Sequence, residues 1–432
     1  MLHMKHWLNK LRTLPIDELM FYVFAFSVPF QLRTILNASD AYINYYFSYH
    51  LAVFVYISDL LFLAFLLSFL IFNKENKRII WPIALPILWS VINVFHVEQW
   101  DLWLYGTLKI AEFWIIIGYL RLKPNLSRPL IYILIVSGWL QAVLATAQFH
   151  VQHAIGFGFL GEYMPATLDS GAATINTLNS KLLRAYGTMA HPNVLGGFLA
   201  VCLILWIYVS RETEKLTNWL IVSCGTIVLT FGLVVTFSRS AWIATLIAVG
   251  YLLIYIAWKI SLKKAVILAA IVIVSCGTSV LVYKNAIYSR IEAPISEKSA
   301  IEYRTDFNAY AVELINVHKI TGLGSGQYIP WLSEAKQLQS WQYQPPHNIL
   351  LMFLTEMGIV GLILSLFTIF LLRFTWNNLT PLNVSLILAI VILGMLDHYL
   401  LTIQTGYILL ALLVGIIITN KKDVSHLRET SN

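Results

Sequence analysis

Long apolar runs recur along the whole chain and alternate with short polar segments. Runs of about 18 or more apolar residues are typical of α-helices that cross a membrane. The pattern predicts an all-α fold, a polytopic transmembrane helix bundle of about twelve spans. No small-residue cleavage site accompanies the first span, so we expect a retained signal anchor. The predicted spans lie at about 17–36, 51–72, 79–96, 101–120, 129–150, 192–210, 218–237, 240–258, 265–283, 347–372, 380–397 and 403–419.

Two longer polar segments interrupt this alternation, at 151–191 and 284–346. Within the second segment, residues 302–318 carry apolar side chains at helical spacing, which predicts an amphipathic helix on the membrane surface. Residues 321–326 then contain three glycines at alternate positions, which permit left-handed turns and close approach of a ligand to the backbone. We expect an N-terminal transmembrane bundle over 1–150, with about five spans, and a second membrane domain over 151–432 that contains both polar segments.

The composition supports the membrane assignment. Of the 432 residues, 58% are hydrophobic and 12% are charged, whereas soluble domains carry roughly 25% charged residues. Lys and Arg gather in alternate short loops, which places both termini in the cytoplasm and both long polar segments outside. The net charge of +7 is therefore mostly a topology signal, and the basic residues form no soluble face for a nucleic acid. The three cysteines fall inside predicted spans and are interpreted as packing residues.

Arg239 interrupts two long apolar spans and has Ser238 and Ser240 on either side. A charge at that depth costs about 2.5–3.5 kcal/mol on insertion scales, and less near an interface. One interpretation is an arginine that snorkels at a tight hairpin. The positive-inside rule argues against it, because this hairpin lies on the predicted outer side. A guanidinium can donate hydrogen bonds to two phosphate oxygens at once, so we favour phosphate binding as the role of Arg239.

The stretch Pro345-Pro346-His347-Asn348 ends the second polar segment and opens a new apolar span. A neutral imidazole at such an edge is a candidate general base. The alternative is a structural histidine that caps its helix together with Asn348. Glu356 adds a polar group to the same span, and the residues alone leave both readings open.

Other polar residues gather on the predicted outer side. Arg304 lies on the predicted surface helix and Arg184 lies shortly before the sixth span. A solvated surface position explains each arginine when it is taken alone. His191 and Asn193 flank a proline, as at an ordinary helix start, and Asp397-His398 at the outer end of the eleventh span is a weaker site candidate.

Charged residues inside the spans need partners. Asp59 lies in the second span, and Lys109 and Glu112 lie three residues apart in the fourth. We interpret them as structural pairing rather than as a proton path. The outer segments contain no clustered carboxylates, so we expect neither a metal site nor a cofactor.

As a set, these motifs resemble the O-antigen ligase and Wzy-type O-antigen polymerase superfamily of membrane glycosyltransferases. Order and spacing agree over about 180–420, whereas the first five spans match only in general pattern. The matching motifs are Arg184…Gly187-Thr188…His191-Pro192-Asn193, Phe237-Ser238-Arg239-Ser240, Arg304 before the glycine-rich turn at 322–326, and Pro346-His347-Asn348…Glu356…Gly358…Gly361.

The resemblance implies an inverting, metal-independent enzyme of the GT-C kind, which acts on the outer face of the cytoplasmic (inner) membrane. Its donor would be a glycan on polyprenyl diphosphate, and its acceptor a hydroxyl of a glycan, lipid or protein, in the biosynthesis of lipopolysaccharide or other envelope polysaccharides. By resemblance, His347 matches the general base, and Arg239 and Arg304 match arginines that bind the donor diphosphate. Arg184 and His191 match positions typical of polymerase-like members, and Arg184 would join Arg239 and Arg304 in binding the diphosphate. Ligase and polymerase both stay open.

A flippase for lipid-linked oligosaccharides is the alternative from another class. It would also be polytopic and would also need cations for a diphosphate. Transporters of this kind usually contain inverted repeats with broken helices in matching halves. No such repeat is visible in the sequence, and the polar residues cluster on one predicted side of the membrane.

Overall fold

The computed structural model describes residues 14–72, 77–169, 171–177, 180–292, 296–372 and 379–420. In this part the chain is mostly helical, so the predicted helical class is confirmed. The strands form only three short antiparallel pairs, β1–β4, β2–β3 and β5–β6. Both chain ends lie outside the described residues, and their expected cytoplasmic location stays a prediction.

Six helical segments of the described chain are long and apolar enough to cross a membrane. They correspond to six of the twelve predicted spans. The other six spans correspond to shorter helices or to α5, which carries four charged residues, so the count of twelve stays a prediction. The six segments are Pro124–Val151, which joins η3 (Pro124–Leu126) to α6 (Ser127–Val151), then α7 (Pro192–Ser210), α8 (Leu216–Val234), α9 (Arg239–Lys259), α10 (Leu262–Val282) and α14 (Ile349–Leu371). The other helices of the bundle are α2 (Ile16–Ser27), α3 (Ile57–Phe72), η2 (Lys77–Ile83), α4 (Ala84–Ile92), α5 (Trp100–Leu122), α15 (Pro381–Leu396), α16 (Tyr399–Thr402) and α17 (Gln404–Thr419).

The first two predicted spans are wrong in part. The expected helix at 17–36 ends at Ser27, and the expected helix at 51–72 begins only at Ile57. The intervening apolar residues form β1 (Arg33–Asn37) and β4 (Val53–Tyr56), which pair antiparallel with Arg33 opposite Tyr56. Pro29 has no backbone N–H and disfavours a continued helix, and β-branched and aromatic residues favour strands in both segments. Hydropathy alone cannot separate such strands from the end of a membrane helix.

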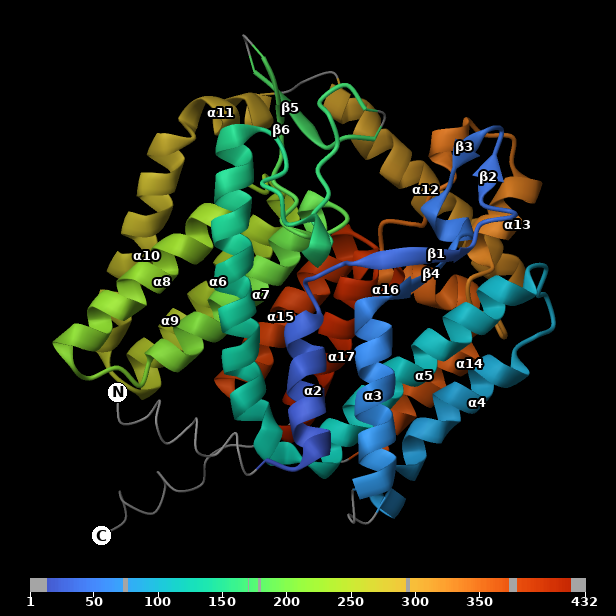
Figure 1. The fold of residues 1–432 in the computed structure, drawn as a ribbon, viewed down its shortest axis with the longest axis horizontal. Helices are drawn as coiled ribbons and strands as arrows, with labels where there is room; N and C mark the ends of the chain where they lie inside the picture. Colours follow the sequence, from blue (N-terminus) through green and yellow to red (C-terminus); the bar gives the residue numbers. More distant parts are fainter. Residues whose placement is uncertain are drawn as a thin grey trace.

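One end of the bundle, in the upper part of Figure 1, carries the strands and the helices between α10 and α14. Both long polar segments contribute to this end, as predicted from their shared side of the membrane. We refer to it as the strand end. Its elements, besides β1 and β4, are β2 (Tyr42–Ile43), β3 (Tyr46–Phe47), η1 (Tyr49–Leu51), η4 (Gly158–Leu160), β5 (Thr174–Asn176), β6 (Lys181–Leu183), α11 (Lys284–Glu292), α12 (Ser296–His318), α13 (Tyr328–Ala335) and η5 (Ser340–Gln342).

The helix predicted at 302–318 is present as α12 and begins six residues earlier, at Ser296. Its apolar face is buried, with Phe307 at 4%, Ala311 at 0% and Leu314 at 1% exposure. Ala311 and Leu314 belong to a buried cluster that also includes Tyr328 of α13 and Met352 of α14. The apolar stripe therefore covers protein, and this contact fixes α12 across the start of α14.

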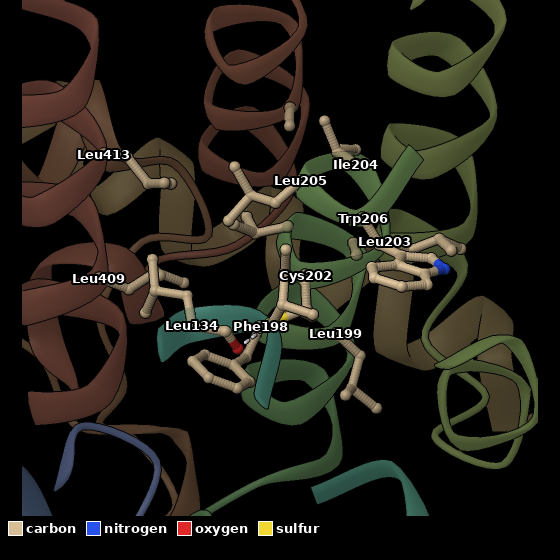
Figure 2. Close-up of a cluster of buried hydrophobic side chains, with 14 of the residues drawn as sticks. Leu134, Phe198, Leu199, Cys202, Leu203, Ile204, Leu205, Trp206, Leu409 and Leu413 are labelled. Carbon is tan, nitrogen blue, oxygen red and sulfur yellow. Dashed lines mark hydrogen bonds between the residues drawn. The ribbon is translucent and has the colours of Figure 1, made fainter. Parts of the chain in front are cut away.

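The main hydrophobic core surrounds α7, which is buried on nearly all sides (Figure 2). Cys202 lies inside this core and donates a hydrogen bond to the carbonyl oxygen of Leu134 at 3.2 Å. Cys224 and Cys276 are exposed on the bundle surface, so the packing interpretation holds for Cys202 only. The same buried cluster contains Phe21 of α2 and Leu409 of α17, and the domain boundary expected at residue 150 stays a prediction.

Helix α14 is broken at Gly358, where φ is 62° and ψ is −174°. A break at membrane depth leaves backbone polar groups that need partners within the protein. Segment 319–324 supplies them, because Ile359 N–H donates to the Lys319 carbonyl at 2.9 Å and Gly324 N–H donates to the Glu356 carbonyl at 2.9 Å. Gly322 and Gly324 adopt φ of 69° and 100°. The expected left-handed glycines are therefore present, and their close backbone partner is α14.

The charged residues of the spans pair as expected. Lys109 forms ion pairs with Asp59 and with Glu112, the latter at 3.3 Å. Gln404 of α17 donates a hydrogen bond to Asp59 at 2.6 Å, and Tyr407 donates one to the Lys109 carbonyl at 2.5 Å. This cluster joins α3, α5 and α17 inside the bundle.

Candidate active site

His347 lies at the entrance to α14, at the strand end. Asn348 is the N-cap of α14, and its side-chain oxygen accepts hydrogen bonds from Leu350 N–H at 2.9 Å and Leu351 N–H at 3.2 Å. Because Asn348 satisfies these helix-end donors, the His347 side chain has no capping task. The imidazole is mostly buried, and its ring lies 6.1 Å from the Phe307 ring of α12.

Asp397 is the closest charged partner of His347 among the described residues. Nδ1 of His347 lies 3.5 Å from Oδ1 of Asp397, which follows the last residue of α15. The carboxylate also accepts hydrogen bonds from Asn193 Nδ2 and from His398 N–H, both at 2.8 Å. Burial acts to raise the pKa of Asp397, but the contact with His347 and the charges of His398 and Arg304 outweigh it and hold that pKa well below its usual range. Asp397 is therefore a carboxylate that can orient His347 and stabilise its protonated form.

Arg184 and Asn193 continue the contacts of Asp397 into the protein interior. Arg184 NH2 donates to Asn193 Oδ1 at 2.6 Å, and Arg184 Nε donates to the Thr236 carbonyl at 2.7 Å. The Arg184 side chain is only 5% exposed, and burial together with the charge of Arg290 lowers its pKa to about 9. A continuous set of contacts, Arg184–Asn193–Asp397–His347, thus connects four residues that were predicted separately.

His191 is the N-cap of α7, and its Nδ1 accepts a hydrogen bond from Asn193 N–H at 3.1 Å. Burial and the charge of Arg184 lower the pKa of His191 to about 3. A neutral imidazole can accept this hydrogen bond, whereas an imidazolium cannot. The expected ordinary helix start is therefore present, and it holds Asn193 in position.

Arg239 is the first residue of α9 and is exposed. Its neighbour Ser238 is the N-cap, and the two hydroxyl groups of Ser238 and Ser240 lie 3.2 Å apart. The N-terminus of a helix favours anions because its first backbone N–H groups have no partner in the helix. Phe237 adopts φ of 48°, a strained conformation for a bulky residue, and it turns the chain sharply into α9. A cation, two hydroxyl groups and a helix N-terminus together suit a phosphate.

Arg304 lies on α12 and belongs to the same electrostatic environment. Its positive charge contributes to the lowered pKa values of Asp397, Arg184 and His191. Arg239 lies three residues after Thr236, and the carbonyl oxygen of Thr236 accepts a hydrogen bond from Arg184. The predicted site residues therefore gather at the strand end, with one exception. Glu356 lies within α14 below this end, where its side chain accepts hydrogen bonds from Gly326 and Tyr328 N–H.

His50 and His398 complete a histidine cluster around His347, of which the sequence analysis named His398 beside Asp397 and missed His50. The ring of His398 lies 5.0 Å from that of His347 and 5.8 Å from that of His50. Burial is the largest cause that lowers the pKa of both groups, to about 4 for His50 and well below the usual value for His398. His398 follows Asp397 directly, which was a usable signal. His50 comes from η1, far away in the sequence, and no motif identifies it.

Three of these groups could approach a metal ion. Ligand atoms of His347, Asp397 and His398 lie within 4.8 Å of one another. Ligands of a tetrahedral zinc ion lie about 3.3 Å apart, from metal–ligand distances near 2.0–2.1 Å. The distance of 3.9 Å from His398 Nε2 to Asp397 Oδ1 is wider than that, and both Asp397 oxygens already accept hydrogen bonds. The expectation of a metal-independent site stays a prediction.

A cavity of about 970 Å³ opens beside the histidine cluster. His50 and His398 line its strand-end part, and Trp114, Ile369 and Val414 line its deepest part. Its walls belong mainly to α5, α14 and α17 and are largely apolar. The described structure thus combines a polar site at one end of the bundle with an apolar cavity that runs into the bundle.

The fold and the site define a polytopic membrane protein with a His–Asp pair at one end of its helices. Residues 224–366 match a family model described as O-antigen ligase. This match supports the resemblance to the O-antigen ligase and Wzy-type superfamily inferred from the motifs. Comparison with curated proteins and with solved structures gave no match. The matched segment contains Ser238, Arg239, Ser240, Arg304, His347, Asn348 and Glu356, whereas Arg184, His191, Asn193 and Asp397 lie outside it.

Together, the family match and the apolar helices indicate a multi-pass inner-membrane protein with a role in glycan transfer. They also indicate association with a lipid-linked glycan.

Proposed function

We propose that the protein is an inverting glycosyltransferase that moves a glycan from a polyprenyl-diphosphate carrier to an acceptor hydroxyl on the outer face of the inner membrane. The observation that carries this proposal is the His347–Asp397 contact of 3.5 Å at the strand end. A sugar hydroxyl is a weak nucleophile and gains from a base that removes its proton as it attacks. An imidazole backed by a buried carboxylate suits that role.

The proposed step is a single displacement. The acceptor oxygen forms a bond to the anomeric carbon of the donor glycan, while the bond from that carbon to the diphosphate oxygen breaks. The hydroxyl proton moves to His347, and Asp397 stabilises the resulting imidazolium. The polyprenyl diphosphate leaves with the bonding electron pair. Attack opposite the leaving group inverts the anomeric configuration.

Arg239 and Arg304 are proposed to bind the donor diphosphate. The support is the exposed Arg239 at a helix N-terminus beside two serine hydroxyl groups, and the position of Arg304 on α12 near Asp397. Preorganised cations of this kind stabilise the charge that develops on a leaving group. Arg184 was expected to bind the diphosphate as well. Its burial and internal hydrogen bonds favour a positioning role through Asn193 and Asp397 instead.

The proposed orientation puts the strand end outside and both termini in the cytoplasm. The N-terminal part, 1–150, would supply one wall of the cavity through α5, and the part 151–432 would supply the polar site. Residues of both parts line the cavity, and the contacts among Arg184, Asn193, Asp397 and His347 lie within 151–432.

The test is transfer by the purified protein in liposomes that contain a radiolabelled polyprenyl-diphosphate glycan. Label should move from the carrier to an added acceptor, and polyprenyl diphosphate should be released in equal amount. If the carrier crossed the bilayer while its glycan stayed attached, the protein would be a transporter and the proposed activity would be wrong.

A further inference from the structure

Two cationic side chains lie on the wall of the cavity, Arg33 of β1 and Lys109 of α5. Their situations differ. Lys109 forms ion pairs with Asp59 and Glu112, so its charge is balanced within the bundle. Arg33 forms no ion pair with any carboxylate among the described residues. Among the residues that the structure describes, the cavity therefore carries one guanidinium whose charge no carboxylate balances.

Aromatic rings fix the position of Arg33. Its guanidinium carbon lies 4.6 Å from the centre of the Phe54 ring and 5.0 Å from that of Tyr49. Its NH1 donates a hydrogen bond to the Tyr56 hydroxyl at 3.2 Å. These contacts stabilise a cation and orient it, but they leave most of its five N–H donors available. A fixed guanidinium with free donors is suited to bidentate binding of a phosphate.

The cavity below Arg33 has the dimensions of a lipid tail. Leu102 and Trp114 both line it, and these residues are twelve positions apart on α5, a rise of about 18 Å. That is more than half of the roughly 30 Å thickness of a bilayer hydrocarbon core. Apolar side chains such as Phe113, Leu366 and Leu410 line the deep part. An anionic headgroup at Arg33 would therefore have room for an apolar chain beneath it.

The same cavity reaches the proposed base. His398 lines the cavity and its ring lies 5.0 Å from that of His347. Arg239 and Arg304 do not belong to the cavity lining. The cationic side chains thus occupy two kinds of position, with Arg33 inside the cavity lining and Arg239 of α9 and Arg304 of α12 outside it. An inverting displacement needs its acceptor opposite the leaving group, so two lipid-linked substrates would need two such positions.

We propose that Arg33 binds the phosphate of a second isoprenoid lipid, whose tail occupies the cavity and whose glycan is the acceptor. The acceptor role in this inference rests on the proposed function. The lipid-phosphate site itself rests only on the cavity and on Arg33. The acceptor role assigns polymerase-type chemistry to the protein, in which one lipid-linked glycan is transferred to another.

Kinetics of the purified full-length protein in nanodiscs test the acceptor role. Arg33→Gln should raise the KM for a polyprenyl-diphosphate-linked acceptor about 10- to 100-fold, the effect of losing a charge-assisted contact. The KM for the donor should stay the same. Arg33→Lys should recover part of the loss, and Lys181→Gln, at an exposed position of β6, should behave like the unchanged protein. An altered donor KM, or no change in either KM, would overturn the proposal.

Photo-crosslinking separates this inference from the proposed activity. A benzophenone-bearing farnesyl diphosphate should label peptides of α5 and α14 in the unchanged protein and in His347→Ala, and labelling should fall at least fivefold in Arg33→Gln. Inorganic diphosphate should compete, and the matching farnesol probe should label weakly. Equal labelling by farnesol, or labelling that does not depend on Arg33, would reject the lipid-phosphate site even if transfer is observed. Thermal melting of each variant checks that Arg33→Gln remains folded.

Discussion

Nδ1 of His347 lies 3.5 Å from Oδ1 of Asp397, although His347 precedes α14 and Asp397 follows α15. Asp397 is held in turn by Asn193, and Asn193 by Arg184. The proposed base is therefore backed by a carboxylate whose own position is fixed by two further side chains. This arrangement distinguishes His347 from a histidine that merely begins a helix.

Asp397→Asn keeps the size of the side chain and removes its charge. We expect kcat for glycan transfer to fall between about 10- and 10⁴-fold, because an imidazole without its orienting carboxylate is a poorer base. The KM for the donor should change little, because Asp397 is buried and its oxygens accept hydrogen bonds from Asn193 and His398 rather than facing a substrate. Steady-state transfer kinetics measure both quantities. Asp169→Asn, which alters an exposed carboxylate at the strand end, is the matched control. A normal kcat in Asp397→Asn would exclude the orienting role.

Arg239→Lys tests whether the fork of the guanidinium is used. Lysine keeps the charge but cannot form a bidentate pair with a diphosphate. Loss of one charge-assisted hydrogen bond corresponds to about 1.5–3 kcal/mol, so kcat/KM for the donor should fall about 10- to 100-fold. Arg128→Lys, at another exposed arginine, should have normal kinetics. Near-normal turnover of Arg239→Lys would instead indicate a role in topology.

Gly358 tests the break in α14. An alanine there would adopt φ of 62° and would place its Cβ 2.3 Å from the Ile320 carbonyl oxygen. We expect the protein to lose stability by about 1–3 kcal/mol from backbone strain alone, and more from the displaced segment 319–324. Gly250→Ala in α9 has nothing within 4 Å of the new Cβ, and it should be neutral or stabilising by about 0.5–1 kcal/mol. Thermal melting in detergent compares the two, and equal melting temperatures would contradict the observed close packing.

The buried histidines predict a pH-dependent stability. Burial lowers the pKa of His191 to about 3 in the folded protein, whereas an unfolded histidine titrates near 6.5. Between these values the unfolded chain binds more protons, so stability falls as the pH drops below about 6.5, by up to about 1.4 kcal/mol per pH unit for each such histidine. The melting temperature should therefore decrease from pH 7 to pH 5.

His191→Asn isolates this effect, because asparagine can still cap α7 without gaining a proton. The variant should have a shallower decrease of melting temperature with pH than the unchanged protein. His153→Ala, at an exposed histidine, should keep the original slope. The same slope in His191→Asn would show that this histidine is not held neutral.

The sequence predicted the elements that depend on local pattern. Long apolar runs with charged loops identified α6 to α10 and α14, and helical spacing identified α12. It failed at β1 and β4, because a strand of Ile, Leu and Val has the same hydropathy as the end of a membrane helix. It also predicted that α12 lies on the membrane surface, whereas the apolar face of α12 covers protein through a long-range contact with α14 that local pattern does not reveal.

The candidate site was predictable where a residue is unusual for its surroundings. Arg239 is a charge between two apolar spans, and His347 and Asn348 mark the start of a span. The contact between His347 and Asp397 could not be predicted in the same way, because it forms only after α14 and α15 have packed side by side. Arg33 was missed because it lies on β1, which hydropathy assigned to a helix, and His50 was missed because it lies on η1, where no motif marks it.

The most direct test of the account is the rate of glycan transfer by His347→Ala in a single turnover with saturating labelled donor. His153→Ala serves as the control, and donor binding is measured in parallel. The account predicts that transfer in His347→Ala falls about 10²- to 10⁴-fold, while donor binding and the melting temperature stay near those of the unchanged protein. Full transfer by His347→Ala would contradict the central claim that this imidazole takes the proton of the acceptor hydroxyl.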